Sequence, residues 1–341
     1  MASTSLPKTY KAAVITKANE PIAIQDLELK QPGHGQVLVK VLACGVCHSD
    51  LFIQRGHLGD VFPRVPGHEI VGDVVAIGDG VTRFKGGERV GGPWHGGHDS
   101  QCRTCNRGQF QCCDNEKING LHFDGGYAEY VLLREEAVVR VPKETDAAEV
   151  APLLCAGVTV FNAMRKQNVE QGNIVAIQGL GGLGHLAVQF ANKMGYRVVA
   201  LSSGSSKKDF ATQLGAHEYI DTSKDDPVKA LLAMGGAAMI VATAPNGDSI
   251  SPLVGGMSPG GKLVVLAPVG PVSFDTGVMV LRQASVVGWP SGHALDSEEA
   301  IAFASTHGVR CMIEKFPLAK AADAMNHIQS GKVRFRGVLT M

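Results

Sequence analysis

The chain has 341 residues, 45% of them hydrophobic, and its 32 basic and 32 acidic residues give a formal net charge of zero. This length suggests about two domains, and the balanced charge favours neither nucleic acid nor an anionic membrane as a partner. No apolar run approaches the ~20 residues of a membrane span, and residues 1–8 lack a signal-peptide apolar segment. We therefore expect a cytoplasmic protein whose eight cysteines are metal ligands or core thiols rather than disulfides.

Residues 10–142 consist mostly of strand-like runs separated by glycine and proline, a pattern typical of an all-β barrel or sandwich. These runs cover residues 10–15, 37–42, 70–77, 127–133 and 138–141. After Pro142 a helix is predicted over 147–154, and strands then alternate with helices, which indicates a doubly wound parallel sheet. The predicted strands are 174–177, 197–201, 219–220, 239–242, 263–266, 286–287 and 338–341, and the helices are 208–214, 228–234 and 319–328.

A glycine-rich turn joins the strand at 174–177 to a helical pattern. Gly179, Gly181 and Gly184 form G-x-G-x-x-G, with Gly182 and Leu183 inside the motif. The first glycine permits the turn, the second lets a pyrophosphate approach the backbone, and the third lets helix and strand pack closely. The helix N-terminus offers N–H groups and a positive dipole end to phosphates. A glycine loop without function is the alternative, but the strand–turn–helix context predicts a dinucleotide site.

Three separated segments carry zinc-type ligands: Cys47 in G-V-C-H-S-D, His68 in P-G-H-E and Cys155 in L-C-A-G. Two thiolates and one imidazole leave a fourth tetrahedral position open, which is the catalytic zinc arrangement. Alone, Cys155 could be a core thiol and His68 a loop histidine. Together with the dinucleotide motif they predict a catalytic metal site.

The sequence resembles the zinc-containing medium-chain alcohol dehydrogenases over nearly its whole length, through the motifs G-V-C-H-S-D, P-G-H-E, C-A-G-V-T and G-L-G-G-L-G in the family's order and spacing. The resemblance implies an α/β plus all-β fold. A GroES-like β-barrel catalytic domain would cover residues 1–155 and be completed by 291–341. An inserted Rossmann domain, a doubly wound parallel sheet, would cover 156–290.

The resemblance also implies the roles of single residues. Cys47, His68 and Cys155 would bind the catalytic zinc, with the adjacent Glu69 as an alternating or outer ligand. Asp50 matches the carboxylate that orients the zinc-binding histidine.

Further matches concern the substrate and the cofactor. Ser49 matches the hydroxyl that contacts the reacting alcohol, whose pKa zinc lowers, and it would pass the alcohol proton outward. Many relatives extend this relay with a histidine three residues later, where this chain has Phe52, so we expect a relay that is shorter or that runs through water or cofactor hydroxyls. Thr159 matches a threonine beside the nicotinamide, and Arg336 matches an arginine that reaches the pyrophosphate.

A second cluster matches the family's structural-zinc lobe, C-x-x-C-x-x-C-x7-C. The second, third and fourth ligands would be Cys102, Cys105 and Cys113, and the first position falls on Asp99. A carboxylate oxygen binds zinc at a similar distance, so an Asp/Cys3 site is chemically sound. The alternatives are His98 as the ligand, or a lobe without metal.

The cofactor preference depends on the end of the strand at 197–201. NAD enzymes usually place an acid about 20 residues beyond the glycine turn, but this chain has Ser202, followed by Ser203 and then by Lys207 and Lys208. Small hydroxyls leave room for a 2′-phosphate, and a lysine would neutralise it. NADP(H) is therefore favoured and NAD(H) is the alternative; the competing interpretation is a helix cap followed by two solvated lysines.

We expect a zinc-dependent alcohol dehydrogenase or aldehyde reductase that transfers a hydride between the nicotinamide cofactor and an apolar primary alcohol or aldehyde. Trp94, Phe52 and the neighbourhood of Leu154 resemble positions that line the family's pocket. A secondary alcohol or ketone reductase is the alternative, as is a non-enzymatic nucleotide-binding protein, although an open metal position beside Ser49 favours the enzyme. The resemblance also implies a homo-oligomer, a dimer or tetramer, built by the Rossmann sheets.

Overall fold

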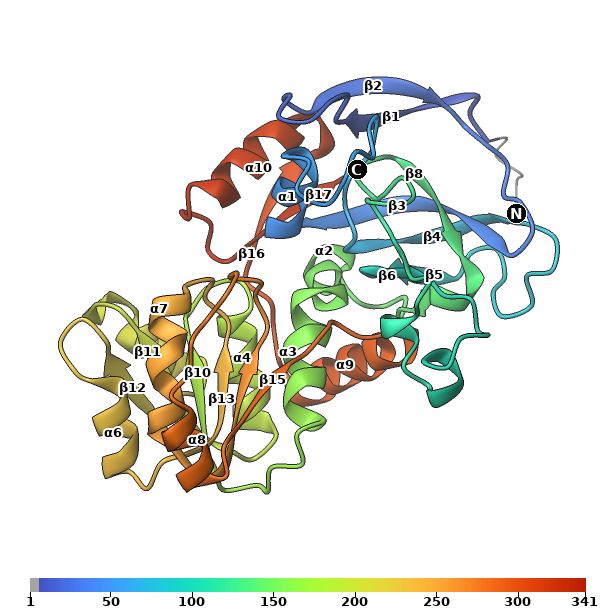
Figure 1. The fold of residues 1–341 in the computed structure, drawn as a ribbon. Helices are drawn as coiled ribbons and strands as arrows, with labels where there is room; N and C mark the ends of the chain where they lie inside the picture. The colour runs from blue at the N-terminus through green and yellow to red at the C-terminus, as the bar shows by residue number, and fades with distance from the viewer. Residues whose placement is uncertain (1–5) are drawn as a thin grey trace. The chain divides into compact units, whose positions relative to one another are not determined.

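A computed structural model of the protein describes residues 6–341. The expectation of no signal peptide falls largely on residues 1–5, which lie outside the described residues. The chain forms two units (Figure 1). The first unit comprises Met1–Cys155, Gly292–Ala302 and Cys311–Met341, and the second comprises Ala156–Ser291 and Phe303–Arg310. The C-terminal return expected over 291–341 is thus interrupted by eight residues that group with the second unit.

The first unit is built on a largely antiparallel seven-stranded sheet. Six of its strands follow one another in the order β16 (Ile313–Pro317), β17 (Arg336–Thr340), β3 (Gln36–Val46), β4 (Ile70–Ile77), β5 (Arg89–Gly92) and β9 (Val139–Arg140). The seventh strand, β8 (Tyr130–Arg134), pairs with the first half of β3, whereas β17 pairs with its second half. β3 is therefore the central strand, and its run of Val, Leu, Ala and Cys is buried along most of its length.

Shorter elements complete the first unit. The sheet encloses one apolar core whose largest buried side chains include Tyr127 and Phe84. The remaining strands form two antiparallel pairs, β1 (Thr9–Val14) with β2 (Ala23–Glu28) and β6 (His95–Gly97) with β7 (Lys117–Ile118). Three α-helices lie wholly within this unit among residues 6–341: α1 (His48–Gln54), α2 (Ala147–Val150) and α10 (Ala321–Gln329).

The second unit contains a parallel six-stranded sheet whose central strands are almost entirely buried. Its spatial order is β12 (Glu218–Asp221), β11 (Arg197–Ser202), β10 (Ile174–Gln178), β13 (Ala237–Ala242), β14 (Met257–Val265) and β15 (Ser285–Gly288). In chain order this is 3-2-1-4-5-6, the Rossmann arrangement. The order reverses beside β10, and this is where such sheets bind nucleotides.

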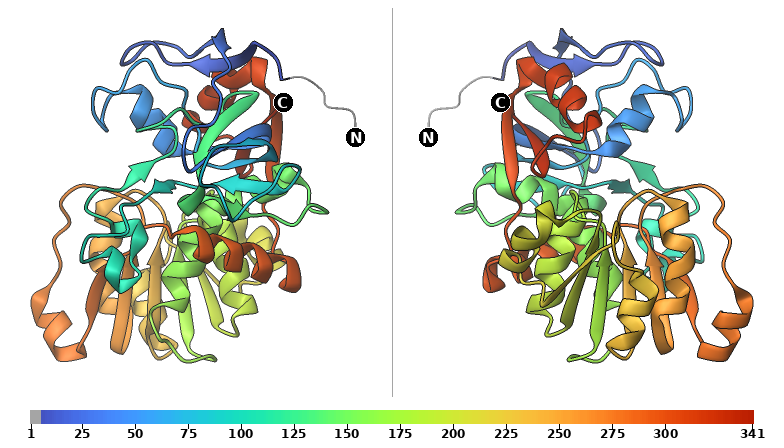
Figure 2. Two further views of the ribbon diagram at one scale, coloured as in Figure 1. Left: turned by 90° about the vertical axis from the view of Figure 1, so that its right-hand side faces the viewer. Right: turned by 90° about the vertical axis from the view of Figure 1, so that its left-hand side faces the viewer.

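Helices cover both faces of the parallel sheet, as the two opposite views of Figure 2 show. They are α3 (Ala156–Arg165), α4 (Gly184–Lys193), α5 (Lys208–Gln213), α6 (Pro227–Ala233), α7 (Gly247–Ile250) and α8 (Thr276–Arg282). α4 packs on β10 and β11, while α6 packs on β12 and β14. The predicted fold class, an all-β unit with an inserted doubly wound parallel sheet, is confirmed.

Some elements differ from the sequence-based expectation. The helix expected over 147–154 is α2 followed by a 3₁₀ turn, Ala151–Leu154, because Pro152 interrupts the α-helical hydrogen bonding. The long helix α9 (Ala294–His307) was not predicted. Among residues 6–341 no single helix is long and apolar enough to cross a membrane; one bent pair, residues 147–154 with 156–165, meets the length and composition criteria.

Candidate active site

Two paired strands of the first unit position the first two candidate metal ligands, Cys47 and His68. β3 ends at Val46, directly before Cys47, and β4 begins at Ile70, directly after His68 and Glu69. Since Cys44 is the register partner of Ile70, the two ligand-bearing segments leave the sheet side by side. The chain then turns from Cys47 into α1, where the Asp50 carboxylate accepts the Cys47 backbone N–H at 2.8 Å. An acid at the third helical position also suits the positive end of the helix dipole.

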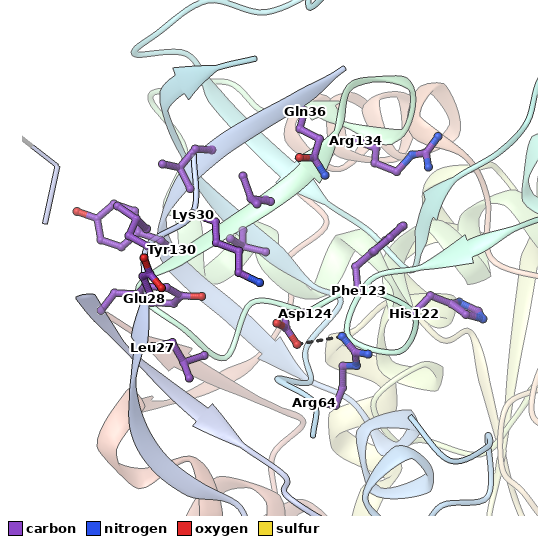
Figure 3. A pocket seen from close by; sticks show the side chains of 15 residues that line it. Leu27, Glu28, Lys30, Gln36, Arg64, His122, Phe123, Asp124, Tyr130 and Arg134 are labelled. Carbon is purple, nitrogen blue, oxygen red and sulfur yellow. Dashed lines mark hydrogen bonds and ion pairs between the residues drawn. The ribbon is translucent and has the colours of Figure 1, made fainter. Parts of the chain in front are cut away.

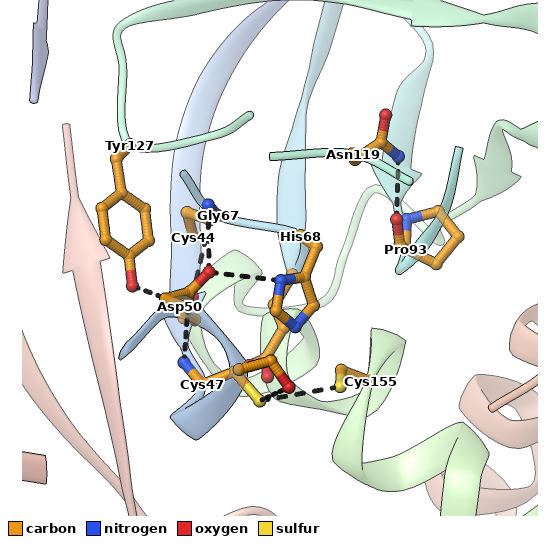
Figure 4. A network of polar contacts seen from close by, with 12 residues as sticks. Cys44, Cys47, Asp50, Gly67, His68, Pro93, Asn119, Tyr127 and Cys155 are labelled. Atoms are coloured by element: carbon orange, nitrogen blue, oxygen red, sulfur yellow. Dashed lines mark hydrogen bonds and ion pairs between the residues drawn. The ribbon is translucent and has the colours of Figure 1, made fainter. Parts of the chain in front are cut away.

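The third ligand joins this pair from the 3₁₀ turn that ends at Cys155. One ligand atom from each of Cys47, His68, Glu69 and Cys155 lies within 4.8 Å of the others, and the two sulphurs are 3.9 Å apart (Figure 4). The Asp50 carboxylate lies 3.3 Å from Nδ1 of His68. Both ring nitrogens are buried and neither makes a hydrogen bond with a described residue, and Nε2 is the one that does not face Asp50. A buried, unsatisfied imidazole nitrogen beside two thiols fits a zinc ion.

The surroundings of the cluster favour the thiolate form of Cys47. A hydrogen bond with Cys155 lowers the pKa of the Cys47 thiol well below its usual range, in spite of burial, and His68 and Arg336 act in the same direction. Burial raises the pKa of Glu69 to about 8. Glu69 is paired with Arg336 through one oxygen, and its other oxygen has no partner among the described residues. Only a glycine at position 45 leaves room for this carboxylate.

The other predicted active-site residues have these positions. Ser49 is half-buried, and its Oγ lies 3.7 Å from Sγ of Cys47. The Trp94 ring packs edge-on against His68 with centroids 4.8 Å apart. Leu154 is fully buried and fills space that Gly91 leaves open, which makes it a core residue. Arg336, expected at the pyrophosphate, is buried in the first unit beside the Glu69 carboxylate.

The candidate structural-zinc lobe brings Asp99, Cys102, Cys105 and Cys113 together, with ligand atoms within 4.8 Å of one another. Backbone N–H groups donate to the sulphurs, for example from Cys105 to Cys102 at 3.4 Å. The side-chain amide of Asn115 donates to Asp99 at 2.6 Å, and it is the main cause of the lowered pKa of that carboxyl.

The two remaining side chains near the lobe point elsewhere. Nδ1 of His98 is 3.0 Å from Nε2 of His95. The ring of His98 also packs in a tilted arrangement against Phe110, with centroids 4.3 Å apart. Cys112 is exposed and is not part of the four-residue cluster. The donor set of three thiols and a carboxylate fits zinc.

The glycine turn of the second unit has the geometry that a dinucleotide requires. Gly179 has a φ of +91°, and a side chain there would collide with Ala244. A Cβ at Gly184 would collide with the carbonyl oxygen of Gly179, so close helix–strand packing depends on this glycine. A Cβ at Gly181 would instead meet no atom within 4 Å. Gly181 therefore borders open space in which a pyrophosphate fits. Gly182 and Leu183 lie between Gly181 and α4.

The loop after β11 carries the predicted cofactor-selecting residues. Ser202 ends the strand and is buried, Ser203 is exposed, and no carboxylate occupies either position. Nζ of Lys207 donates to the carbonyl oxygen of Leu180 at 3.3 Å, which places its ammonium group against the glycine turn. Thr159 lies buried on α3.

A carboxylate that the sequence pattern did not single out, Asp221, lies beside this loop. Asp221 ends β12 in register with Ser202, and it accepts the backbone N–H of Gly204 at 2.7 Å. It also accepts the hydroxyl of Ser223 at 2.6 Å. The sequence could have indicated this position, because neighbouring parallel strands end at the same edge of a sheet. Asp221 therefore holds the backbone of the cofactor-selecting loop.

A separate cavity of about 380 Å³ lies between β1, β2 and β8 of the first unit (Figure 3). It is lined by aromatic and charged side chains, and Arg64 pairs with Asp124 in it at 3.0 Å. None of the predicted metal ligands or cofactor-binding residues lines this cavity.

An open thiolate–imidazole cluster in one unit and a Rossmann glycine turn in the other define a metal-containing dehydrogenase. Comparison with known proteins gives the same result. The family model described as "Alcohol dehydrogenase GroES-like domain" matches residues 33–143, and the model described as "Zinc-binding dehydrogenase" matches residues 182–306. Alcohol dehydrogenase patD from Penicillium expansum is 55% identical over 341 residues, which cover 100% of both chains.

Solved structures agree. Acetophenone reductase from Geotrichum candidum, in complex with NAD, has a TM-score of 0.86 at 28% identity and covers 99% of this chain and 98% of its own. CAD from Helicobacter pylori, complexed with NADP(H), has a TM-score of 0.86 at 27% identity and covers 98% of this chain and 99% of its own. The chain belongs to the zinc-containing medium-chain alcohol dehydrogenase family. It is an alcohol dehydrogenase that uses zinc and a nicotinamide cofactor, and the predicted resemblance and GroES-like fold are confirmed.

Proposed function

We propose that this enzyme interconverts an apolar primary alcohol and its aldehyde with NADP(H) as the preferred cofactor. The observation that carries the proposal is the buried cluster of Cys47, His68 and Cys155 with the Ser49 hydroxyl 3.7 Å from a ligand sulphur. Two thiols and one imidazole leave a coordination position for a substrate oxygen, which a purely structural site does not offer.

The proposed ligands of the catalytic zinc are Cys47, His68 and Cys155, with Glu69 as the alternating ligand. Zinc in such a site acts as a Lewis acid that lowers the pKa of a hydroxyl group, and the nicotinamide cofactor exchanges the hydride. Asp50 faces Nδ1 of His68 at 3.3 Å, which leaves Nε2 for the metal.

The proton leaves the substrate through Ser49. This side chain is half-buried on the first turn of α1, so its hydroxyl reaches both the cluster and the solvent side. Phe52 follows one turn later, and its ring packs between those of His48 and His57 at centroid distances of 5.4 and 5.9 Å. A phenyl ring carries no proton, so the relay from Ser49 bypasses position 52.

The preference for an apolar substrate is supported by the aromatic surface beside the ligands. The Trp94 ring packs at a right angle to the His68 ring with centroids 4.8 Å apart, which puts a large aromatic side chain beside a candidate metal ligand. A secondary alcohol or ketone is the alternative substrate class, and one solved relative is named acetophenone reductase.

The preference for NADP(H) is supported by the loop after β11. Ser202 and Ser203 present no acid to the ribose, and the Lys207 ammonium lies against the glycine turn. Asp221 lies in register with Ser202; its Oδ1 accepts hydrogen bonds from Gly204 and Ser223, and its Oδ2 is buried without a hydrogen-bond partner among the described residues. Thr159 stays assigned to the nicotinamide. The assignment of Arg336 to the pyrophosphate requires its side chain to leave the Glu69 carboxylate with which it is paired.

The proposal extends to the structural zinc, which Asp99, Cys102, Cys105 and Cys113 would hold, and to the assembly. β15 is an edge strand of the parallel sheet, and α8, which precedes it in the chain, exposes Val280 (77%) and Leu281 (87%). An unpaired edge strand and exposed apolar side chains are typical of an association surface, and we assign this surface to a homo-oligomer. We place this enzyme in the cytoplasm, with small molecules and neither membrane nor nucleic acid as partners.

A substrate panel tests the proposal. Purified enzyme is assayed with primary alcohols, their aldehydes, secondary alcohols and acetophenone, each with both nicotinamide cofactors. We expect the highest kcat/KM with an apolar aldehyde and NADPH. A higher kcat/KM for ketones than for aldehydes would favour the alternative substrate class, and better use of NADH would refute the cofactor preference.

A further inference from the structure

A buried network surrounds Asp50, behind the candidate zinc ligands (Figure 4). Oδ2 of Asp50 accepts two hydrogen bonds, from the Cys47 backbone N–H at 2.8 Å and from the Tyr127 hydroxyl at 2.9 Å. Oδ1 accepts the Gly67 backbone N–H at 3.2 Å and faces Nδ1 of His68 at 3.3 Å. Each oxygen of this carboxylate therefore has fixed partners, and the only side-chain donor to Oδ2 is Tyr127 among the described residues.

Tyr127 is held in place independently of Asp50. Its side chain is 0% exposed, and its backbone N–H donates to the carbonyl oxygen of Pro66 at 3.1 Å. Its ring lies against Gly67, where φ is +102° and a side chain would collide with the ring. The backbone of Ala13 donates to the Tyr127 carbonyl oxygen at 2.8 Å. Tyr127 thus links the core to the loop that carries His68.

The hydroxyl and the ring have separable consequences. The ring fills the core and supports the loop through packing. The hydroxyl contributes one charge-assisted hydrogen bond, which resists rotation of the Asp50 carboxylate away from His68. Partners behind metal ligands typically change metal affinity about 10- to 100-fold when they are removed.

We propose that Tyr127 is a positioning residue of the catalytic zinc site: its hydroxyl holds Asp50 so that His68 keeps Nε2 directed at the metal. This inference rests on the proposed zinc ligands. Tyr127 acts one step further from the metal than Asp50, so its removal has an effect near the lower end of the range, roughly 10-fold.

The test is the rate at which the intact zinc-loaded enzyme releases zinc to a chromogenic chelator. Tyr127→Phe removes the hydroxyl and keeps the ring, and we expect the catalytic-site release phase to be roughly 10-fold faster. The release phase from the lobe of Asp99 and the three cysteines serves as the internal reference and should not change. Cys47→Ala identifies the catalytic phase, because this variant should lack it.

Tyr130→Phe is the matched control, since Tyr130 lies three residues later and its ring packs edge-on against Tyr10, away from Asp50. Asp50→Asn and the double variant with Tyr127→Phe form a mutant cycle. If the tyrosine acts through Asp50, the effect of Tyr127→Phe on zinc release should largely disappear in the Asp50→Asn background.

The outcomes distinguish a failure of the positioning role of Tyr127 from a failure of the proposed zinc ligands. A catalytic phase that is as slow in Tyr127→Phe as in the unmodified enzyme, or effects that simply multiply in the double variant, would overturn the positioning role and leave the proposed function intact. Two unchanged release phases in Cys47→Ala would instead overturn the proposed catalytic ligands.

Discussion

The glycine turn makes two alanine substitutions, three residues apart, behave in opposite ways. A methyl group at Gly181 meets no protein atom within 4 Å, whereas one at Gly184 would collide with the Gly179 carbonyl oxygen. Gly181→Ala should therefore leave the fold as stable as before, or slightly more stable, because alanine restricts the unfolded chain. Gly184→Ala should destabilise the second unit, because the backbone must move.

The magnitudes follow from the same geometry. In Gly181→Ala the methyl group occupies space assigned to the pyrophosphate, and overpacking of this kind costs about 1–3 kcal/mol. At 1.4 kcal/mol per tenfold change, nucleotide affinity should fall roughly 5- to 150-fold. In Gly184→Ala the same cost lowers the free energy of unfolding. Each kcal/mol lost lowers Tm by about 2–4 °C for a protein of this size or somewhat smaller.

Two measurements on each variant check this reasoning. Nucleotide Kd is measured by the change in cofactor fluorescence on binding, and Tm by calorimetry of the nucleotide-free protein. We expect Gly181→Ala to lose affinity at constant Tm and Gly184→Ala to lose Tm. Nucleotide bound by Gly181→Ala as tightly as by the unmodified enzyme would show that the pyrophosphate does not lie at this turn.

Four further outcomes are expected. Elemental analysis should give about two zinc ions per chain and about one for Asp99→Ala; an unchanged zinc content in that variant would remove Asp99 from the lobe's ligand set. Ser49→Ala should lower kcat about 10²- to 10⁴-fold, as for other positioned acid–base groups, and a retained rate would show that the proton takes another path. Ser202→Asp should shift the kcat/KM ratio towards NADH by repelling the 2′-phosphate, and an unshifted ratio would contradict the proposed phosphate site. Leu281→Lys should shift the oligomer towards monomer in light scattering, and an unaltered mass would place the interface elsewhere.

Several local features were predictable from the sequence. The strand–glycine–helix turn depends on residues within about a dozen positions, so the motif itself specifies the turn, the open space at Gly181 and the packing at Gly184. The candidate zinc ligands Cys47, His68 and Cys155 could also be predicted from the sequence, because two thiols and an imidazole are typical of an open zinc site. Most buried strands were found by their apolar runs, although β8 begins at Tyr130 rather than at residue 127.

Other features were decided only by the tertiary structure. α9 has little amphipathic periodicity in its sequence because its buried face carries Asp296 and Ser297 while Leu295 is exposed, so its pattern gave no helical signal. Tyr127 and Asp221 looked like ordinary strand residues, and their roles arise from partners 77 and 17 positions away, Asp50 and Gly204. The pairing of Arg336 with Glu69 spans 267 positions. Local sequence determines which side chains are available, but buried polar groups take whichever partners long-range packing brings to them.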